Sequence, residues 1–163
     1  MNIRNTQPND ISKIVILEKE IEKDNAASLN TLTSRFNMFK EGFFVSQEDG
    51  RIQGYIESCL WDRKDIETFD EIKDFPKNHD PNGKTLYVIF LGVGKDYRRK
   101  GIGSRLIRTV QEYARKNDLD KVQLVAGGGF LVDFYTNLGF KNIKELPKFL
   151  PYKKGTLMEY YLK

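Results

Sequence analysis

The sequence contains few of the residues that build cross-links and metal sites. Cys59 and His79 are its single cysteine and its single histidine among 163 residues. One cysteine cannot form a disulfide within the chain, and neither residue type is numerous enough for a zinc cage or a cluster of histidine ligands. The sequence therefore predicts that the protein binds no metal and relies on a hydrophobic core.

Long apolar runs are missing as well. The longest stretch without strongly polar side chains, Leu86–Gly94, has nine residues, whereas a helix that crosses a bilayer needs about 20. The first residues also lack the basic-then-apolar pattern of a secretory signal. We therefore expect a cytoplasmic protein with no membrane partner.

Charge is nearly balanced between the two signs. Lysine and arginine number 27 and aspartate and glutamate 23, which gives a net charge of +4. This excess points to neither nucleic acid nor a membrane surface as a partner. Hydrophobic residues make up 39% of the chain, and a chain of roughly 150 residues buries enough surface to fold without cross-links. We expect residues 1–163 to form a single domain.

Hydrophobic periodicity predicts a mixed α/β fold. Helices are expected from an Asp10 N-cap to about Lys23, from a Ser28 N-cap to about Phe39, over Ile102–Lys116 and over Phe130–Leu138. Strands are expected over Asn2–Arg4, Gly42–Gln47, Arg51–Trp61, Thr85–Val93, Lys121–Ala126, Phe140–Lys144 and Thr156–Leu162. The polar stretch Asp62–Gly83, with a helical turn near Ile66–Phe75, is long for a loop, and such loops are often functional. The order indicates one sheet covered by helices.

A basic turn between a strand and a helix is the segment richest in chemistry. Arg98, Arg99 and Lys100 precede Gly101, and a helix is expected to start at Ile102. The first N–H groups of a helix lack partners and its dipole is positive there, so the position suits a phosphate. Glycine leaves room for a pyrophosphate to approach the backbone. The turn therefore predicts a site for a phosphate-bearing cofactor.

Two common phosphate motifs do not fit this turn. No Gly-Lys-Ser/Thr follows, which excludes a Walker loop. Tyr97 stands where a dinucleotide-binding fingerprint would have its third glycine. A solvated basic turn without a ligand remains the simpler alternative.

Together with a second motif, Asp133-Phe-Tyr-Thr-Asn-Leu-Gly-Phe140, the turn resembles the acetyl-CoA motifs of the GCN5-related N-acetyltransferase (GNAT) superfamily. Within it the chain is most similar to arylalkylamine N-acetyltransferases. The matching features are Glu18-x-Glu20 with Ala26-Ala-Ser28 downstream, Leu60-Trp-Asp62, and His79-Asp-Pro-Asn-Gly83. The resemblance implies acetyl-CoA as co-substrate. It also implies a mostly antiparallel sheet of six to seven strands flanked by about four helices, with a splayed central strand pair.

The resemblance further implies roles for individual residues. Leu91 and Val93 would offer main-chain groups to the pantetheine arm, and Phe134 would lie beside the cofactor. The pyrophosphate would be held by Arg98, Arg99, Lys100, Gly101, Ile102, Gly103 and Ser104. Tyr135 matches the tyrosine that protonates the departing thiolate, since a phenol of pKa about 10 can donate to a thiolate whose thiol has a pKa of about 8.5. The alternative is that Phe134 and Tyr135 are core aromatics.

The residue that takes the proton of the acceptor amine is less clearly marked. The two central-strand histidines of arylalkylamine N-acetyltransferases are absent, and Tyr87 and Ile89 stand in their places. Tyr87 is expected to act through an ordered water chain, because a phenol is a poor base at pH 7. Glu57 is expected either in the acceptor pocket or in a salt bridge. His79 is of the residue type that titrates near neutrality, but a lone histidine in a loop is more often a surface residue than a catalytic one.

The expected acceptor is a small primary amine, of the arylalkylamine or polyamine-like kind. Trp61 and Phe36 are expected to line an aromatic acceptor pocket together with His79, with core packing as the alternative for Phe36. Between Glu57 and Asp80 there are eight acidic and four basic residues, and such a local field favours a cation. In contrast, Lys95–Lys116 has eight basic and two acidic residues, as an anionic cofactor requires.

Two other functions stay open. The acceptor could be a protein lysine or N-terminus, with Asp62–Gly83 as a peptide groove, or the chain could be a CoA-binding module without catalysis. Nucleic acid is not expected, because no aromatic stacking platform is interleaved with the basic residues. A homodimer is left open.

Overall fold

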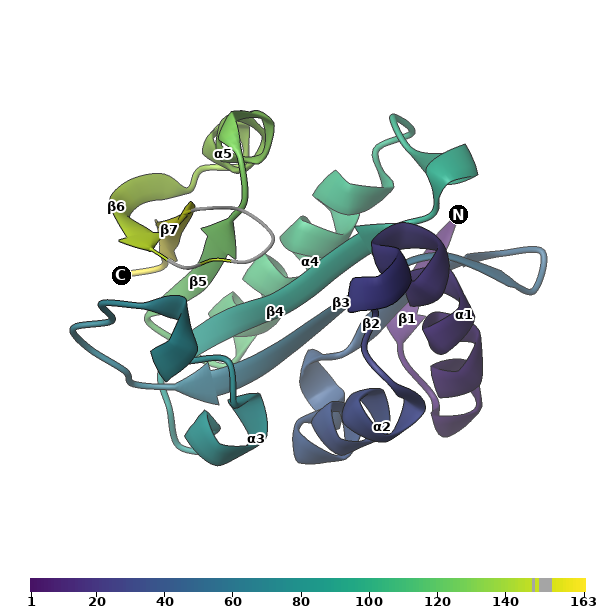
Figure 1. The fold of residues 1–163 in the computed structure, drawn as a ribbon, viewed down its shortest axis with the longest axis horizontal. Coiled ribbons are helices and arrows are strands. Elements are labelled where there is room, and N and C mark those ends of the chain that lie inside the picture. The colour runs from purple at the N-terminus through teal and green to yellow at the C-terminus, as the bar shows by residue number, and fades with distance from the viewer. Residues whose placement is uncertain (148, 150–153) are drawn as a thin grey trace. The chain divides into compact units, whose positions relative to one another are not determined.

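The computed structural model describes residues 1–147, 149 and 154–163. Within them, seven strands form one mixed sheet in the order β1-β2-β3-β4-β5-β7-β6 (Figure 1). The strands are β1 (Asn2–Asn5), β2 (Phe44–Glu48), β3 (Arg51–Trp61), β4 (Thr85–Val93), β5 (Lys121–Ala126), β6 (Lys141–Pro147) and β7 (Lys154–Tyr161). The helices are α1 (Ile11–Glu22), α2 (Leu29–Met38), α3 (Phe75–Asn78), α4 (Ile102–Lys116) and α5 (Gly129–Asn137). The expected α/β sheet of six to seven strands is confirmed.

The predicted elements are confirmed with small changes. The helical turn expected near Ile66–Phe75 becomes a 3-10 turn at Phe69–Glu71 followed by α3, which adds a fifth helix to the four expected. The side chain of Asp74 caps α3 and Pro76 occupies its first turn, a position that suits proline because the missing N–H is not needed there. The strand expected over Phe140–Lys144 is Lys141–Pro147 instead, because pairing with β7 continues to Pro147.

Contacts divide the described chain into two compact units. Unit 1 comprises Met1–Ser58 and Ile89–Val110, and unit 2 comprises Cys59–Val88 and Gln111–Lys163. Strands β3 and β4 and helix α4 contribute residues to both. None of the helices among the described residues is long and apolar enough to span a membrane.

Unit 1 packs α1 and α2 through apolar side chains. The buried cluster contains Ile11, Ile14, Leu17, Leu32, Phe36, Phe43, Val45, Ile52 and Tyr55. Ser28 caps α2 as expected, since its Oγ accepts the N–H of Thr31 at 3.1 Å. The β2–β3 hairpin turns at Asp49 and Gly50, both at positive φ, which is the Asp-Gly turn that the sequence indicates.

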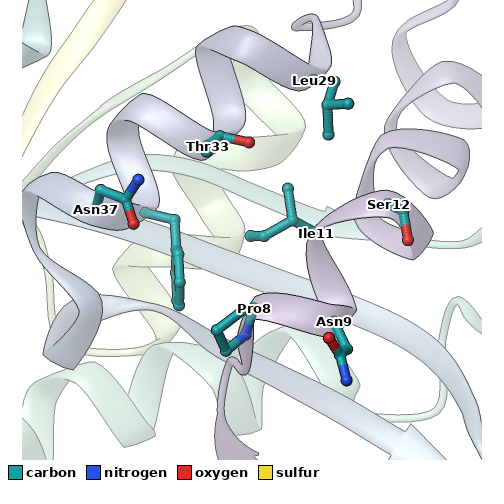
Figure 2. A pocket seen from close by; sticks show the side chains of 8 residues that line it. Pro8, Asn9, Ile11, Ser12, Leu29, Thr33 and Asn37 are labelled. Carbon is teal, nitrogen blue, oxygen red and sulfur yellow. The ribbon is translucent and has the colours of Figure 1, made fainter.

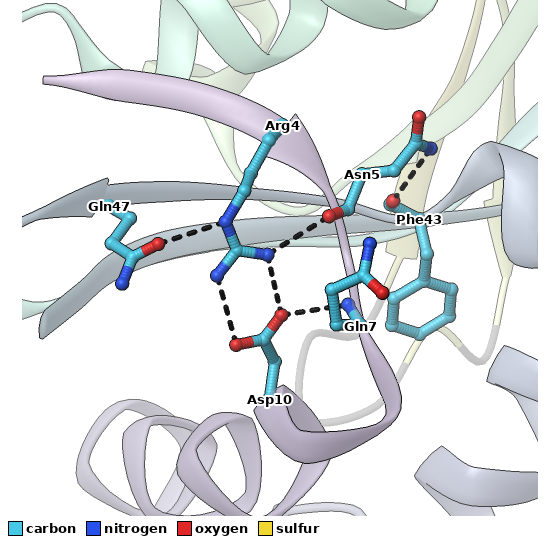
Figure 3. Close-up of polar contacts among 6 residues, drawn as sticks. All are labelled: Arg4, Asn5, Gln7, Asp10, Phe43 and Gln47. Carbon is cyan, nitrogen blue, oxygen red and sulfur yellow. Dashed lines mark hydrogen bonds and ion pairs between the residues drawn. The ribbon is translucent and has the colours of Figure 1, made fainter. Parts of the chain in front are cut away.

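Asp10 stands at the start of α1, but its side chain does not cap that helix. Its carboxylate accepts two hydrogen bonds from the guanidinium of Arg4, at 2.7 and 3.1 Å, and one from the N–H of Gln7 at 2.8 Å (Figure 3). Arg4 also donates to Gln47 on β2 at 2.9 Å. The pair therefore ties β1, β2 and the start of α1 together. Burial opposes ionisation, yet these donors hold the pKa of Asp10 below its usual value.

In unit 2, β7 pairs antiparallel with β5 and β6. β4 pairs parallel with β5, from Thr85 opposite Lys121 to Tyr87 opposite Gln123. Val88 and Leu124, the next residues of the two strands in this unit, have no place in that ladder although both strands continue. The paired stretch thus ends before the strands do, as expected for a splayed central pair.

Asp10→Asn is expected to destabilise the protein by about 2–3 kcal/mol, because it removes the charge that the part-buried Arg4 guanidinium requires. Urea unfolding at pH 7 measures the effect. Asp49→Asn, the same change in an exposed turn, is the control and should change stability by less than about 0.5 kcal/mol. Equal effects of the two substitutions would contradict the role given to the Arg4–Asp10 pair.

Candidate functional site

The end of β4 and the basic turn lie in unit 1, where β3 fixes their position. The N–H of Gly94 donates to the carbonyl of Gln53 at 2.9 Å. A Cβ on Gly54 would lie 2.8 Å from the carbonyl oxygen of Gly92, so only glycine permits this approach. The N–H of Lys95 donates to the Glu20 carboxylate at 3.1 Å. These contacts determine where β4 stops and the turn begins.

The turn has the backbone geometry of an anion cradle. Arg99 and Gly101 both have positive φ, at 62° and 80°, and the first bond of the α4 ladder runs from the N–H of Arg105 to the carbonyl of Gly101 at 3.1 Å. The N–H groups of the four residues before Arg105 precede that ladder and lack intrahelical acceptors. A Cβ on Gly101 would meet no atom within 4 Å, so this side of the backbone is open.

The predicted pyrophosphate residues are distributed around this cradle. Arg98, Arg99, Lys100 and Gly101 are exposed, Gly103 and Ser104 are half-buried, and Ile102 is buried. Because the Ile102 side chain belongs to the core, it can offer a ligand only its N–H. Arg98 Nε donates to the carbonyl of Val93 at 3.2 Å, so part of this cation is used within the turn.

The predicted pantetheine contacts, Leu91 and Val93, are both half-buried on β4. Between them Gly92 lies against Tyr55, since a Cβ at Gly92 would be 3.2 Å from that ring and 2.7 Å from the ring of Phe90. The rings of Tyr55 and Phe90 are stacked at 5.5 Å. Gly54 and Gly92 were not predicted as site residues; the only sequence signal is a glycine inside a strand, which often marks close backbone approach.

Two buried carboxylates lie on β3 and α1 in unit 1. Glu18 accepts the hydroxyl of Tyr55 at 2.5 Å and the N–H of Ala27 at 2.6 Å. Glu57 accepts a hydrogen bond from Arg35 Nη1 to its Oε1 at 3.0 Å. Its other oxygen, Oε2, is buried and has no hydrogen-bond partner among the described residues. The sequence left Glu57 open between a pocket and a salt bridge, and this geometry combines a salt bridge with an unused oxygen.

The environment of Glu57 shifts its proton affinity toward neutrality. Its side chain is fully buried, and this burial raises the pKa to about 7, with Arg35 opposing the rise and Glu18 adding to it. Burial also raises the pKa of Tyr55 well above its usual value. Glu57 is therefore a carboxyl that changes charge near pH 7, the property a general base needs.

Three aromatic residues of unit 2, Trp61, Tyr87 and Phe75, pack against one another. Trp61 lies 4.3 Å from the ring of Tyr87 and 6.4 Å from that of Phe75, between ring centroids. The indole N–H of Trp61 donates to Gln123 at 3.0 Å, and Gln123 donates to Glu159 at 2.8 Å. Trp61 is 1% exposed. In this structure it is therefore packed in the core of unit 2, and its contact with an acceptor stays a prediction.

Tyr87 and Tyr135 both belong to unit 2 and are both buried. Burial raises the pKa of Tyr87 far above its usual value, and Cys59 and Tyr135 add to the rise. Burial likewise raises the pKa of Tyr135. Each phenol therefore keeps its proton at any working pH, which suits a hydrogen-bond donor and does not suit a base. Phe134, which is half-buried, packs edge-on against Tyr135 at 5.0 Å.

His79 anchors the end of the Asp62–Gly83 segment to β3 within unit 2. Its Nδ1 accepts the N–H of Leu60 at 3.1 Å, and the next residue, Asp80, donates its N–H to the Leu60 carbonyl at 2.7 Å. Two acidic residues of this segment also have polar partners. Asp62 accepts a hydrogen bond from the N–H of Lys84, and Glu67 forms an ion pair with Lys144. Asp62 is thus hydrogen-bonded and Glu67 is ion-paired within unit 2.

Phe36 is among the residues that line a pocket of about 500 Å³. Figure 2 shows this pocket between the start of α1 and α2. The pocket is lined by Pro8, Asn9, Ile11, Ser12, Leu29, Thr33, Phe36 and Asn37. Phe36 itself is 3% exposed and packs edge-on against Phe43. No cluster of three or more potential metal ligands occurs in the part of the chain that the structure describes.

Comparisons with known proteins agree with this architecture. Residues 11–140 match the model of the acetyltransferase (GNAT) family. YkwB of Bacillus subtilis (strain 168), an uncharacterized N-acetyltransferase, is 30% identical over 146 residues, which are 83% of this chain and 63% of YkwB. YhcX of the same organism, a probable hydrolase, is 33% identical over 134 residues, 78% of this chain and 26% of YhcX. The chain thus spans less than two thirds of either relative.

A solved structure with a similar fold is the GphF GNAT-like decarboxylase in complex with isobutyryl-CoA. Its TM-score with this chain is 0.87 and the two sequences are 20% identical. The superposition covers 100% of both chains. The chain belongs to the acetyltransferase (GNAT) family. This confirms the superfamily expected from the sequence. The arylalkylamine branch stays a prediction.

Glu57→Gln is expected to change how stability depends on pH. A pKa raised from 4.5 to about 7 means that the folded state binds a proton more tightly than the unfolded state. Wild-type stability should therefore lose about 3 kcal/mol relative to the Gln variant as the pH rises from 4.5 to above 7. Urea unfolding across this range measures the difference. Glu112→Gln, at an exposed position, is the control, and parallel curves for wild type and Glu57→Gln would refute the shift.

Proposed function

We propose that this chain is an N-acetyltransferase that moves the acetyl group of acetyl-CoA to a primary amine by direct attack. The observation that carries the proposal is the cradle at the start of α4, where the first N–H groups lack intrahelical acceptors and the space beside Gly101 is open. Such a site suits the pyrophosphate of a CoA ester. Family membership supports the same chemistry.

The residues of the turn fit this co-substrate. Arg99 and Lys100 are exposed cations of this turn, and the main chain of Leu91 and Val93 is the proposed contact of the pantetheine arm. Phe134 is proposed as a further cofactor contact. Acetyl-CoA supplies an activated acetyl group as a thioester. The protein has to bind it, orient the amine and manage two protons.

Tyr135 is the proposed proton donor to the thiolate of CoA. Its raised pKa keeps it protonated, and its ring is held against Phe134 and Phe140. A fixed neutral phenol stabilises a developing thiolate by a charge-assisted hydrogen bond.

Glu57 is the proposed proton acceptor, in preference to Tyr87. An alkylammonium group of pKa about 10 is almost fully protonated at pH 7, so the site must remove a proton before attack. Glu57 titrates near pH 7 and has an unused buried oxygen. Tyr87 is far too weak an acid to exist as phenolate, and its proposed role is reduced to orienting groups by hydrogen bonding.

The proposed acceptor is a small cationic amine, arylalkylamine or polyamine-like. Glu18 and Glu57 are buried in unit 1 with one compensating cation, Arg35. Glu22 adds a third carboxylate, whose pKa is raised by partial burial and by Glu18. A surplus of buried carboxylate favours a ligand that brings its own positive charge.

Gly101→Glu is expected to abolish detectable acetyl-CoA binding, because a carboxylate would project into the cradle where phosphate should lie. Isothermal titration calorimetry with acetyl-CoA measures it. Gly50→Glu is a matched control, since Gly50 also has positive φ and open space around its missing Cβ but lies in the β2–β3 turn. Equal affinity of Gly101→Glu and wild type would refute the cradle.

Tyr135→Phe is expected to lower kcat by about 100-fold or more, the usual size of a lost acid–base contribution, with acetyl-CoA affinity unchanged. CoA release is measured with the best acceptor from a panel of arylalkylamines, polyamines, lysine peptides and peptides with free N-termini. Tyr113→Phe on α4 is the control. An unchanged kcat would reject the donor role. A wild type that releases CoA with none of these amines would reject N-acetyl transfer itself.

A further inference from the structure

The ion pair between α2 and β3 gives the two oxygens of Glu57 different environments. Oε1 accepts from Arg35 Nη1 at 3.0 Å, whereas Oε2 is enclosed without a partner among the described residues. A buried carboxylate oxygen without a donor costs about 1–3 kcal/mol or more. Native structures rarely keep such a group without a reason.

We propose that Arg35 is a positioning residue of the transfer reaction, which holds Oε1 of Glu57 and leaves Oε2 as the oxygen that takes the proton of the acceptor ammonium. The inference rests on the proposed N-acetyl transfer. It adds a residue from α2 that contributes no atom to the reaction itself. Its proposed effect on the reaction passes through Glu57.

The proton balance of this step is complete. The ammonium N–H bond breaks, its proton moves to Oε2, and Glu57 changes from carboxylate to carboxylic acid. The nitrogen keeps the electron pair and forms the C–N bond as the C–S bond of the thioester breaks. The second proton that nitrogen loses balances the one that converts the thiolate to thiol. Glu57 then returns its proton to water.

The charges around Glu57 explain why one arginine matters here. Arg35 on α2 stabilises the carboxylate, and Glu18 on α1 opposes it. Tyr55, on the same strand, has its hydroxyl committed to Glu18 at 2.5 Å and so does not donate to Glu57. Without Arg35, burial and Glu18 would both favour the protonated acid, which cannot accept a proton at pH 7.

The Arg35 side chain also connects the buried pair to the surface. Arg35 is 19% exposed while Glu57 is 0% exposed. Salt therefore screens the pair less than a surface ion pair, and a substitution at Arg35 acts on the proton affinity of Glu57 without touching the cradle at Gly101.

The test compares pH profiles of kcat/KM for Arg35→Gln, Arg35→Lys and wild type, using the best amine of the panel. Loss of the opposite charge should move the acidic limb of the profile to a higher pH by about one pH unit or more. This shift lowers kcat/KM by about fivefold or more at pH 7. Arg35→Lys should restore part of the shift. Arg51→Gln is the control, because Arg51 is exposed and lies on β3, the strand that carries Glu57. This substitution should leave the acidic limb of the profile at its wild-type pH.

A purely structural role of Arg35 predicts a different result, in which activity falls equally at every pH and the limb does not move. That outcome overturns the inference. A wild type that releases no CoA refutes the proposed function instead. In that case urea unfolding across pH still decides whether Arg35 acts on Glu57. The pH range over which stability falls should extend above 7 in Arg35→Gln, and an unchanged range overturns the inference.

Discussion

The approach of β3 to β4 in unit 1 is the constraint on which the candidate site depends. Gly54 has no Cβ, so the carbonyl of Gly92 can lie close to it, and the N–H of Gly94 can bond to Gln53. This contact determines where β4 ends, and hence where the basic turn and α4 begin. An anion cradle needs helix N–H groups at a fixed place. The close approach of Gly54 on β3 to Gly92 on β4 fixes that place.

Unit 1 also buries the carboxylates of Glu18 and Glu57, and hydrogen bonds compensate the cost of that burial unequally. Glu18 receives two short hydrogen bonds, from Tyr55 and Ala27, whereas Glu57 receives one donor on one oxygen. The better-satisfied carboxylate links α1 to β3 and to the segment before α2. The less-satisfied one remains able to change its charge. Polar groups that a fold leaves incompletely paired are more often functional than those it fully satisfies.

Local sequence signals predicted the fold and the cradle, whereas contacts distant in sequence could not be predicted. The Asp49-Gly50 turn, the Ser28 cap and the strand–turn–helix around Gly101 depend on neighbouring residues, and all three appear in the structure. Arg35 and Glu57 are 22 residues apart, and Trp61 and Gln123 are 62 apart. No sequence periodicity connects residues so far apart. Glu57 and Trp61 could therefore be predicted as candidate residues from the sequence, but their partners Arg35 and Gln123 could not.

The same physical effect acts differently on the two candidate bases. Burial favours the neutral form of any acid. For Tyr87 this moves a pKa that is already too high even further from neutrality, and for Glu57 it moves a pKa that is too low to about 7. A carboxyl with a pKa of about 4.5 would hold a proton too weakly to take it from an ammonium group. A dry environment therefore improves the glutamate as a base and removes the tyrosine from that role, and Arg35 keeps the glutamate from becoming permanently neutral.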